Sequence, residues 1–202
     1  MCADLNYDVL GLTETHDRGT HPTTGHFIPG DPASTLDRAA GVALMLSQRV
    51  ARCVIHSGCI GSRIVYARIR AAICHIFIVC VYVPHSQHSN PSRATTLEEL
   101  EKLLKNVPHS DCIMLLGDMN SCLPRSYEKL TGRWCVHKNV DRHGGGNAIL
   151  DLMRRHSLVA ASTLHKTTSK AHKCNLYPME LILQATSNQL HPLLCKVGKL
   201  RL

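Results

Sequence analysis

The sequence predicts a single-domain, mixed α/β sandwich. Short apolar segments typical of strands outnumber the segments typical of helices, adjacent strand segments often follow one another directly, and helical segments are interspersed among them. A chain of 202 residues, 44% of them hydrophobic, can build one domain with a sizeable core and does not require two.

Five strands are predicted in the first half of the chain, each a short apolar segment bounded by turn-forming residues. The first, 7–15, ends in polar residues, and the longest, 73–84, is β-branched and halted by Pro84, which is typical of a central strand. Residues 16–40 are rich in His, Thr, Pro, Gly and Asp and predict a long loop. The other predicted strands are 41–46, 53–56 and 63–70.

Two helices and two further strands are predicted in the second half. Thr95 or Thr96 can cap the first helix, with Glu98 or Glu99 three residues later as a capping box. The second helix is predicted over 147–156. The remaining segments are a strand over 112–116, a long basic loop over 123–146 and a strand candidate over 158–163.

The charge of the chain favours a polyanionic partner. Lys and Arg number 23 against 15 Asp and Glu, which gives a net charge of +8, and 14 His add positive charge below neutral pH. Nucleic acid is the simplest such partner. No apolar run approaches the roughly 18 residues that cross a bilayer, and the N-terminus lacks the features of a signal peptide. We therefore expect an intracellular protein, in the nucleus rather than the cytoplasm.

The ten cysteines predict neither a zinc site nor a disulfide framework. A zinc site favours Cys pairs separated by two to four residues, and the close pairs here, Cys53 with Cys59 and Cys74 with Cys80, are spaced more widely. Several cysteines lie inside apolar strands, where we expect them to be small buried hydrophobes.

The segment MLLGDMNS, residues 114–121, places polar groups at the end of an apolar strand. Gly117 lets the chain leave the sheet tightly, and alternation sends Asp118 and Asn120 to the same side. A carboxylate beside an amide oxygen suits Mg²⁺, which keeps most of its waters. Asp, Asn and Ser are also ordinary turn residues, so these residues alone favour a plain turn.

Polar groups recur at three strand ends: Glu14 after VLGLT, Tyr82 in VYVPH, and Asp118 with Asn120 after MLLG. In this order they resemble the endonuclease/exonuclease/phosphatase superfamily. More narrowly, they resemble the endonuclease domain of non-LTR (LINE- and RTE-type) retrotransposons and host-encoded relatives of the craniofacial development protein 2 type. The resemblance runs from about residue 4 to residue 170, and six segments in order favour a site over a turn at Asp118. These segments are DVLGLTETH, GVALMLS, RIVYARI, VCVYVPH, LLGDMNS and GNAILDLMRRHSLVAASTLHK.

The resemblance implies a four-layer α/β sandwich, in which two mixed β-sheets lie face to face, flanked by helices, with the active site at one end of the sheets. Glu14 would bind Mg²⁺ or Mn²⁺, and Asp118 would orient or deprotonate the attacking water. Asn120 would hold that water or a phosphate oxygen. Tyr82 would stabilise the phosphate in the transition state, although a packing role for this aromatic is equally open. The implied reaction is hydrolysis of a phosphodiester bond in DNA, with the charge that develops at phosphorus stabilised by metal and donors.

Departures from the family pattern lead us to expect an incomplete member. The chain begins after the family strand that carries an Asn, and it lacks the C-terminal SDH element, whose His pairs with an Asp. His191 before Pro192 is a faint counterpart, and Ser162-Thr163 replaces the usual Asn-Thr. Loss of a positioned acid/base group typically costs about 10²–10⁴ in rate. We expect a partial domain over 1–170, a divergent tail over 171–202, and weak or absent activity.

Three functions follow as hypotheses. In the first, the chain is a DNA endonuclease that contacts the phosphate backbone as a monomer, without membrane attachment. In the second, it is a non-catalytic remnant that binds nucleic acid or a protein. In the third, it is a phosphatase of the same superfamily. The net charge counts against the phosphatase.

Further candidate groups lie near the same strand ends and in the long basic loop. The histidines are ordinarily solvated, and the basic residues could contact phosphates or serve solubility alone. Trp134, the single tryptophan, could stack on a base or cover core. The other candidates are His16, His85, His88, Arg125, Arg133, Lys138 and Arg142.

Overall fold

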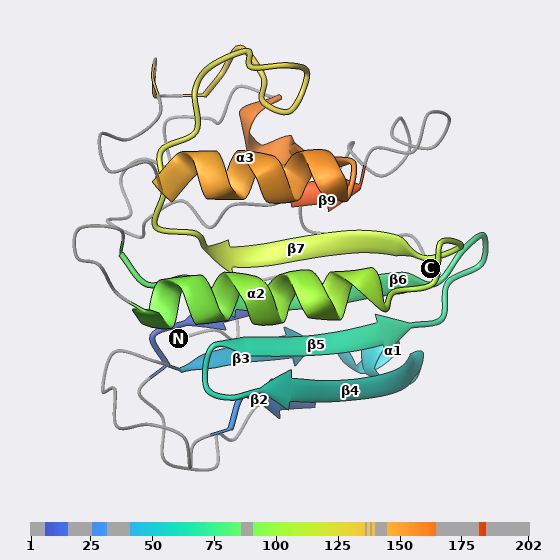
Figure 1. Ribbon diagram of the computed structural model, residues 1–202. Helices are drawn as coiled ribbons and strands as arrows, with labels where there is room; N and C mark the ends of the chain where they lie inside the picture. Colours follow the sequence, from blue (N-terminus) through green and yellow to red (C-terminus); the bar gives the residue numbers. More distant parts are fainter. Residues whose placement is uncertain are drawn as a thin grey trace.

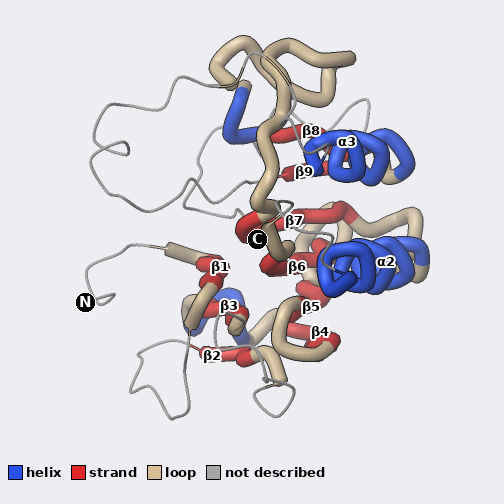
Figure 2. Tube along the Cα trace, turned by 60° about the vertical axis from the view of Figure 1, so that its left-hand side comes forward, coloured by secondary structure: helices blue, strands red, loops and turns tan. Residues whose placement is uncertain are grey.

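The protein folds as two β-sheets that lie face to face, with helices on the outer side of the larger sheet (Figure 2). The predicted α/β sandwich is therefore confirmed. The computed structural model describes residues 7–15, 26–31, 41–85, 91–135, 137, 139, 145–164 and 182–184. Within them, three of the four expected layers are formed: the smaller sheet, the larger sheet and one helical layer.

The smaller sheet is antiparallel and has the order β1-β3-β2. Its strands are β1 (Val9–Thr13), β2 (His26–Pro29) and β3 (Val42–Leu46). All five residues of β3 are buried, as expected of its central place. Strand β2 lies inside the segment predicted as a long loop, so that prediction was wrong there. Only four residues long, β2 has exposed ends and finishes at a proline, which leaves no alternation to recognise.

The larger sheet is mixed and has the order β4-β5-β6-β7-β9-β8 (Figure 1). Strands β6 and β7 run parallel, and every other neighbouring pair is antiparallel. All seven residues of β6 are buried, which confirms the predicted central strand. The strands are β4 (Val54–Ile60), β5 (Ile64–Ile69), β6 (Ile76–Tyr82), β7 (Cys112–Asp118), β8 (Leu158–Ala160) and β9 (Ile182–Gln184).

Two long helices cover the outer face of the larger sheet (Figure 1). They are α2 (Pro91–Lys105) and α3 (Gly145–Arg155); a short helix, α1 (Gln48–Ala51), follows β3, and a 3₁₀ turn over Ala161–Thr163 follows β8. The capping box predicted for the first helix was wrong, because α2 begins at a proline, a residue suited to the first helical turn. Thr95 and Thr96 lie within the helix, where their hydroxyls donate to the carbonyls four residues earlier at 3.0 and 2.7 Å.

Two apolar cores hold these layers together. One lies between the sheets and includes Leu44 and Ile78; the other lies between the larger sheet and the helices and includes Leu100 and Ile149. No helix in the described part of the chain is long and apolar enough to cross a membrane.

A buried ion pair fastens the larger sheet at the end where β7 begins. Asp111 is 3% exposed and accepts hydrogen bonds from Nε and a terminal nitrogen of Arg68 at 2.6 and 3.0 Å. Since Arg68 lies on β5 and Asp111 precedes β7, the pair spans β6 and fixes the three strands in register.

Candidate active site at the ends of β6 and β7

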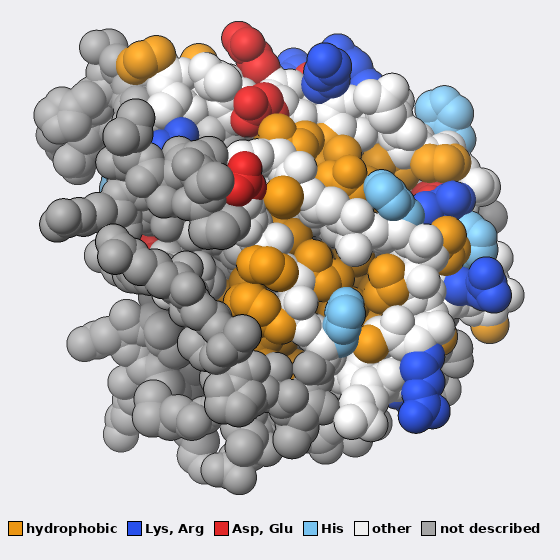
Figure 3. All heavy atoms as spheres, turned by 90° about the horizontal axis from the view of Figure 1, so that it is seen from below, with side chains coloured by type: hydrophobic (Ala, Val, Ile, Leu, Met, Phe, Trp, Pro, Cys, Tyr) orange, Lys and Arg blue, Asp and Glu red, His pale blue; other side chains and the backbone are white. Residues whose placement is uncertain are grey.

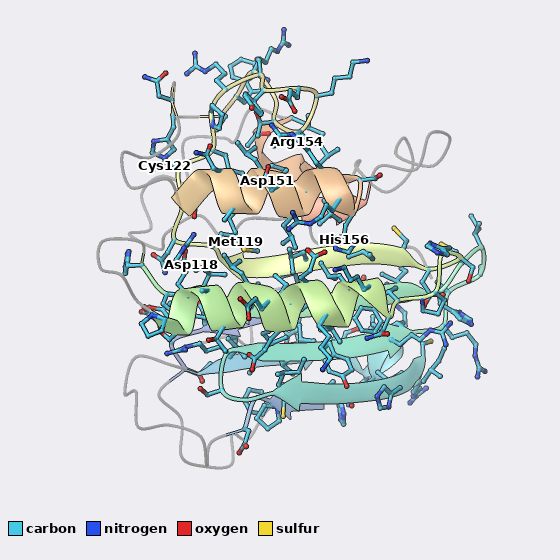
Figure 4. All side chains as sticks on the ribbon, in the orientation of Figure 1. Asp118, Met119, Cys122, Asp151, Arg154 and His156 are labelled. Carbon is cyan, nitrogen blue, oxygen red and sulfur yellow. The ribbon has the colours of Figure 1, made fainter. Side chains whose placement is uncertain are left out.

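The candidate site lies where the parallel strands β6 and β7 end together. Tyr82 and Asp118 are register partners in the last position of the pairing. One further hydrogen bond between the two segments follows, in which the Val83 N–H donates to the Asp118 carbonyl at 2.8 Å. The chain then separates into two segments that leave the sheet at the same edge. Figure 4 shows Asp118 and Met119 at this end.

Gly117 allows β7 to approach β6 closely just before the site. Its φ is +126°, and a Cβ placed on it would lie 1.9 Å from the Val81 carbonyl oxygen. Any side chain here would push the two strands apart at their last pairs. Asp118 therefore owes its position to the absence of a side chain on the preceding residue.

Asp118 and Asn120 form a compact turn. The Asn120 N–H donates to Oδ1 of Asp118 at 2.8 Å, and the Asn120 side-chain nitrogen donates to the Val83 carbonyl at 2.9 Å. These bonds fix both side chains, and the second carboxylate oxygen of Asp118 and the amide oxygen of Asn120 take no part in them. Asn120 has a φ of 44°, a left-handed conformation that Asn tolerates better than most residues.

Glu14 lies at the same end of the sandwich, on the smaller sheet. The Cys80 thiol donates to the Leu12 carbonyl at 3.5 Å, and these two residues precede Tyr82 and Glu14 by two positions each. Strands β1 and β6 therefore end side by side across the core. Glu14 is exposed and has a φ of 54°, a strained conformation for a residue with a long side chain.

Tyr82 is packed rather than open. It is 5% exposed and belongs to the core between the sheets, and its N–H donates to the Arg63 carbonyl at 2.9 Å. The packing interpretation of this aromatic is thus established by its surroundings, while its contact with a phosphate stays a prediction.

The donor groups at this end suit a hard cation. Among the described residues, no group of three or more His, Cys, Asp or Glu side chains gathers as a metal site would. Mg²⁺ does not require such a group, because it retains several waters and is often bound by one or two carboxylates. The carboxylates of Glu14 and Asp118 and the free amide oxygen of Asn120 are chemically fitted to it. Their individual roles stay predictions.

Arg93 was not among the predicted site residues, yet its side chain connects the chain segments that form the site. It lies in the first turn of α2 and is 8% exposed. Its guanidinium donates to the carbonyls of Pro84, Met119 and Gly145 at 2.5, 3.3 and 3.1 Å, and to the Ser121 hydroxyl at 2.7 Å. It therefore joins the exits of β6 and β7 to the start of α3. Its spacing from Leu97 and Leu100 puts it on the apolar face of the helix, and that signal could have predicted its burial.

The remaining candidates fall in three groups. His85 is exposed at the exit of β6. Arg125 and Arg133 are exposed in the loop after β7, where Nε of Arg125 also donates to the Cys135 carbonyl at 2.9 Å. The candidates outside the described residues are His16, His88, Lys138, Arg142 and His191.

Comparisons with known proteins concern the sequence as a whole and the fold. No family model matches the chain. It is 24% identical over 169 residues to craniofacial development protein 2 of Tragulus javanicus and to that of Bos taurus, a match that covers 82% of this chain. The chain spans 29% and 28% of the length of these two relatives.

Two solved structures share the fold at low sequence identity. AP endonuclease LMAP from Leishmania major superposes with a TM-score of 0.53 at 12% identity, over 88% of this chain and 70% of the other. A humanized D. rerio TDP2 with 14 mutations superposes with a TM-score of 0.51 at 12% identity, over 90% of this chain and 69% of the other. The chain therefore has the fold of the endonuclease/exonuclease/phosphatase superfamily, with distant homology to craniofacial development protein 2.

Proposed function

We propose that this chain is a Mg²⁺-dependent phosphodiesterase-type DNA endonuclease domain of retrotransposon origin. The observation that carries the proposal is the arrangement at one end of the sandwich. Glu14 and the Asp118/Asn120 turn project from neighbouring strand ends, and both Glu14 and Asn120 are held in left-handed backbone conformations. For Glu14, which has a long side chain, this conformation is strained, and backbone strain concentrates at functional sites.

Each side chain has a role that its environment allows. Glu14, exposed beyond β1, would hold the metal, and Mn²⁺ would substitute. Asp118 would orient or deprotonate water through the oxygen that its turn leaves open, and the amide oxygen of Asn120 would accept a hydrogen bond from this water. Tyr82 would reach the phosphate from the core. When bound, the metal would stabilise the charge that develops on the phosphoryl oxygens.

We expect the reaction to be slow. Among the described residues, the His–carboxylate ion pair is that of His156 with Glu101, at 3.3 Å between the end of α3 and the middle of α2. Figure 4 places His156 away from Asp118. No such pair serves the candidate site within these residues, and a missing general acid/base typically lowers a rate by about 10²–10⁴. The same observation favours the second candidate, a non-catalytic domain that binds nucleic acid.

A plasmid-nicking assay separates these functions. Purified protein is incubated with supercoiled DNA in Mg²⁺, beside Asp118→Ala, Glu14→Ala and the matched control Asp151→Ala. Asp151 is an exposed carboxylate on α3, paired with Arg154 at 2.6 Å, so its removal changes the net charge equally without touching the site.

Slow nicking that requires Mg²⁺ or Mn²⁺, vanishes in both site variants and survives in the control is the expected result. Nicking that persists in Asp118→Ala would come from a contaminant and would refute the enzyme. DNA binding without any nicking would assign the non-catalytic function.

A further inference from the structure

Trp134 is the only tryptophan of the chain, and 41% of its surface is exposed. A side chain of this size stabilises a fold most when it is buried. Its exposed ring surface, on a loop whose Arg125, Lys129 and Arg133 are also exposed, therefore offers a contact for a ligand.

The backbone beneath Trp134 is held firmly in place. The Trp134 N–H donates to the Thr163 carbonyl at 3.1 Å, and the Gly132 N–H donates to the Thr163 hydroxyl at 2.6 Å. A Cβ on Gly132 would lie 2.2 Å from the Thr163 carbonyl oxygen, so the loop is pressed against the 3₁₀ turn after β8. The exposed ring is thus presented from a fixed frame, which lowers the entropy lost on binding.

The loop that carries Trp134 begins at the candidate site. The Cys135 thiol donates to the Leu123 carbonyl at 3.0 Å, which returns the chain to a point five residues beyond Asp118. Figure 4 shows Cys122, the neighbour of Leu123, at the same end of the molecule as Asp118. The loop that carries the ring therefore lies at the same end of the molecule as the site.

A cationic group lies over the ring, and further basic residues lie on the same loop. The guanidinium of Arg133 lies 5.1 Å from the centre of the Trp134 ring, and Arg125 and Lys129 are exposed on the same loop. Glu128, the single acid between 122 and 135, is already paired with Arg154 at 2.6 Å. An aromatic face beside guanidinium groups suits a base next to its phosphate.

On the opposite face, the described side chains do not show this combination. Figure 3, seen from below Figure 1, shows hydrophobic side chains gathered in the middle of the face, and the described Lys and Arg scattered at its margin. The described basic side chains in that view form no continuous track for a phosphate backbone.

We propose that Trp134 and Arg133 form a stacking platform for an unpaired DNA base at the same end of the molecule as the candidate active site. The inference rests on the proposed action on DNA and adds to it a preference for single-stranded or locally opened substrate. Inside a duplex both faces of a base are covered by its neighbours, so an aromatic ring can stack only on a base that has left the stack. Stacking of this kind tolerates any sequence.

The single tryptophan makes the proposal directly testable, because intrinsic fluorescence reports on this ring alone. The full chain is titrated in EDTA with oligo(dT) of twelve nucleotides, with a blunt duplex of the same length, and with inorganic polyphosphate. We expect strong quenching by oligo(dT), weaker quenching by the duplex and little by polyphosphate, which carries charge without bases. Equal quenching by polyphosphate, or none by oligo(dT), would overturn the platform.

Variants supply the second measurement, by anisotropy of labelled oligo(dT). Trp134→Ala should weaken binding about tenfold or more, and Trp134→Phe should retain most of the affinity. Arg133→Ala should reduce the slope of log affinity against log salt concentration by about 0.7, because one phosphate contact is lost. The control Arg155→Ala removes an exposed arginine at the end of α3 and should change affinity little. Trp134→Ala binding that equals the wild type would refute the proposal.

Failure of this inference is distinguishable from failure of the proposed function. Binding is measured without metal, so an inactive chain can still show stacking. If the Trp134→Ala variant nicks plasmid at the normal rate and binds oligo(dT) with unchanged affinity, the proposed endonuclease function stands and the proposed stacking platform is refuted.

Discussion

At the scale of single residues, the backbone at the candidate site depends on three unusual conformations. Glu14, Gly117 and Asn120 all have positive φ, and each lies at a strand exit. Glycine and asparagine adopt this region at small cost, whereas glutamate does not. The surrounding structure must therefore stabilise Glu14, and its carboxylate is presented at a place that a relaxed chain would not choose.

Replacement of Gly117 by alanine should be strongly destabilising. The new Cβ would meet the Val81 carbonyl, which is backbone and cannot move aside, and the positive φ adds strain. We expect a loss of about 2 kcal/mol or more in the free energy of unfolding, measured by urea denaturation. The control is Gly58→Ala, whose Cβ would meet the far end of the Tyr66 side chain. Equal stability of the two variants would contradict the close strand approach.

At the scale of elements, the site is an assembly of segment ends that α2 holds in place. Four hydrogen bonds from Arg93 reach three different segments, so this one side chain substitutes for secondary structure where the strands have stopped. A lysine could satisfy only part of this set, because it lacks the planar fork of donors.

Arg93→Met should loosen these segment ends. Buried carbonyls would lose their donor, and an unsatisfied buried group costs about 1–3 kcal/mol. We expect a lower urea midpoint and faster proteolysis of the segment after β7. Arg155→Met, which removes an arginine whose side chain is 54% exposed, serves as the control and should leave both unchanged. Resistance of Arg93→Met to protease would show that the exits are held by other contacts.

Long apolar strands and their polar ends could be predicted from the sequence, since burial and alternation are local properties. The run that became β6 and the exit after Leu116 were identified in this way. Strand β9 could not be identified in this way, because its own sequence has no clean hydrophobic period. It forms through pairing with β7 and β8. It lies in the segment assigned to the tail. The contribution of Arg93 likewise depends on segments that only the fold brings together.

At the scale of the whole molecule, buried thiols couple stability to pH. Burial raises the pKa of Cys80 to about 12, and burial with the neighbouring Cys74 raises the pKa of Cys112 to about 11. Unfolded thiols ionise near pH 8.5. The unfolded state therefore loses these protons first. The contribution of the two thiols to the free energy of unfolding is fully present below about pH 8.5 and declines as pH rises toward 11–12.

We expect the free energy of unfolding to fall by up to about 1.4 kcal/mol per pH unit for each thiol above pH 8.5. Urea denaturation at pH 7.5, 9 and 10.5 measures this slope. Other groups also titrate in this range, so Cys80→Ala is the reference, and its slope should be shallower. Identical slopes would show that the Cys80 thiol is not sheltered from ionisation.

The order of the strands in the larger sheet has a consequence for synthesis on the ribosome. Strand β9 is the last of the described strands in the sequence, yet it lies between β7 and β8, and it pairs with both. A nascent chain that has emerged only as far as β8 cannot close this side of the sheet. The pairing of β8 with the rest of the sheet, and with it the final packing of α3 against β8, can form only after the segment that contains β9 has left the exit tunnel. Chaperones that shield exposed strand edges would act during that interval.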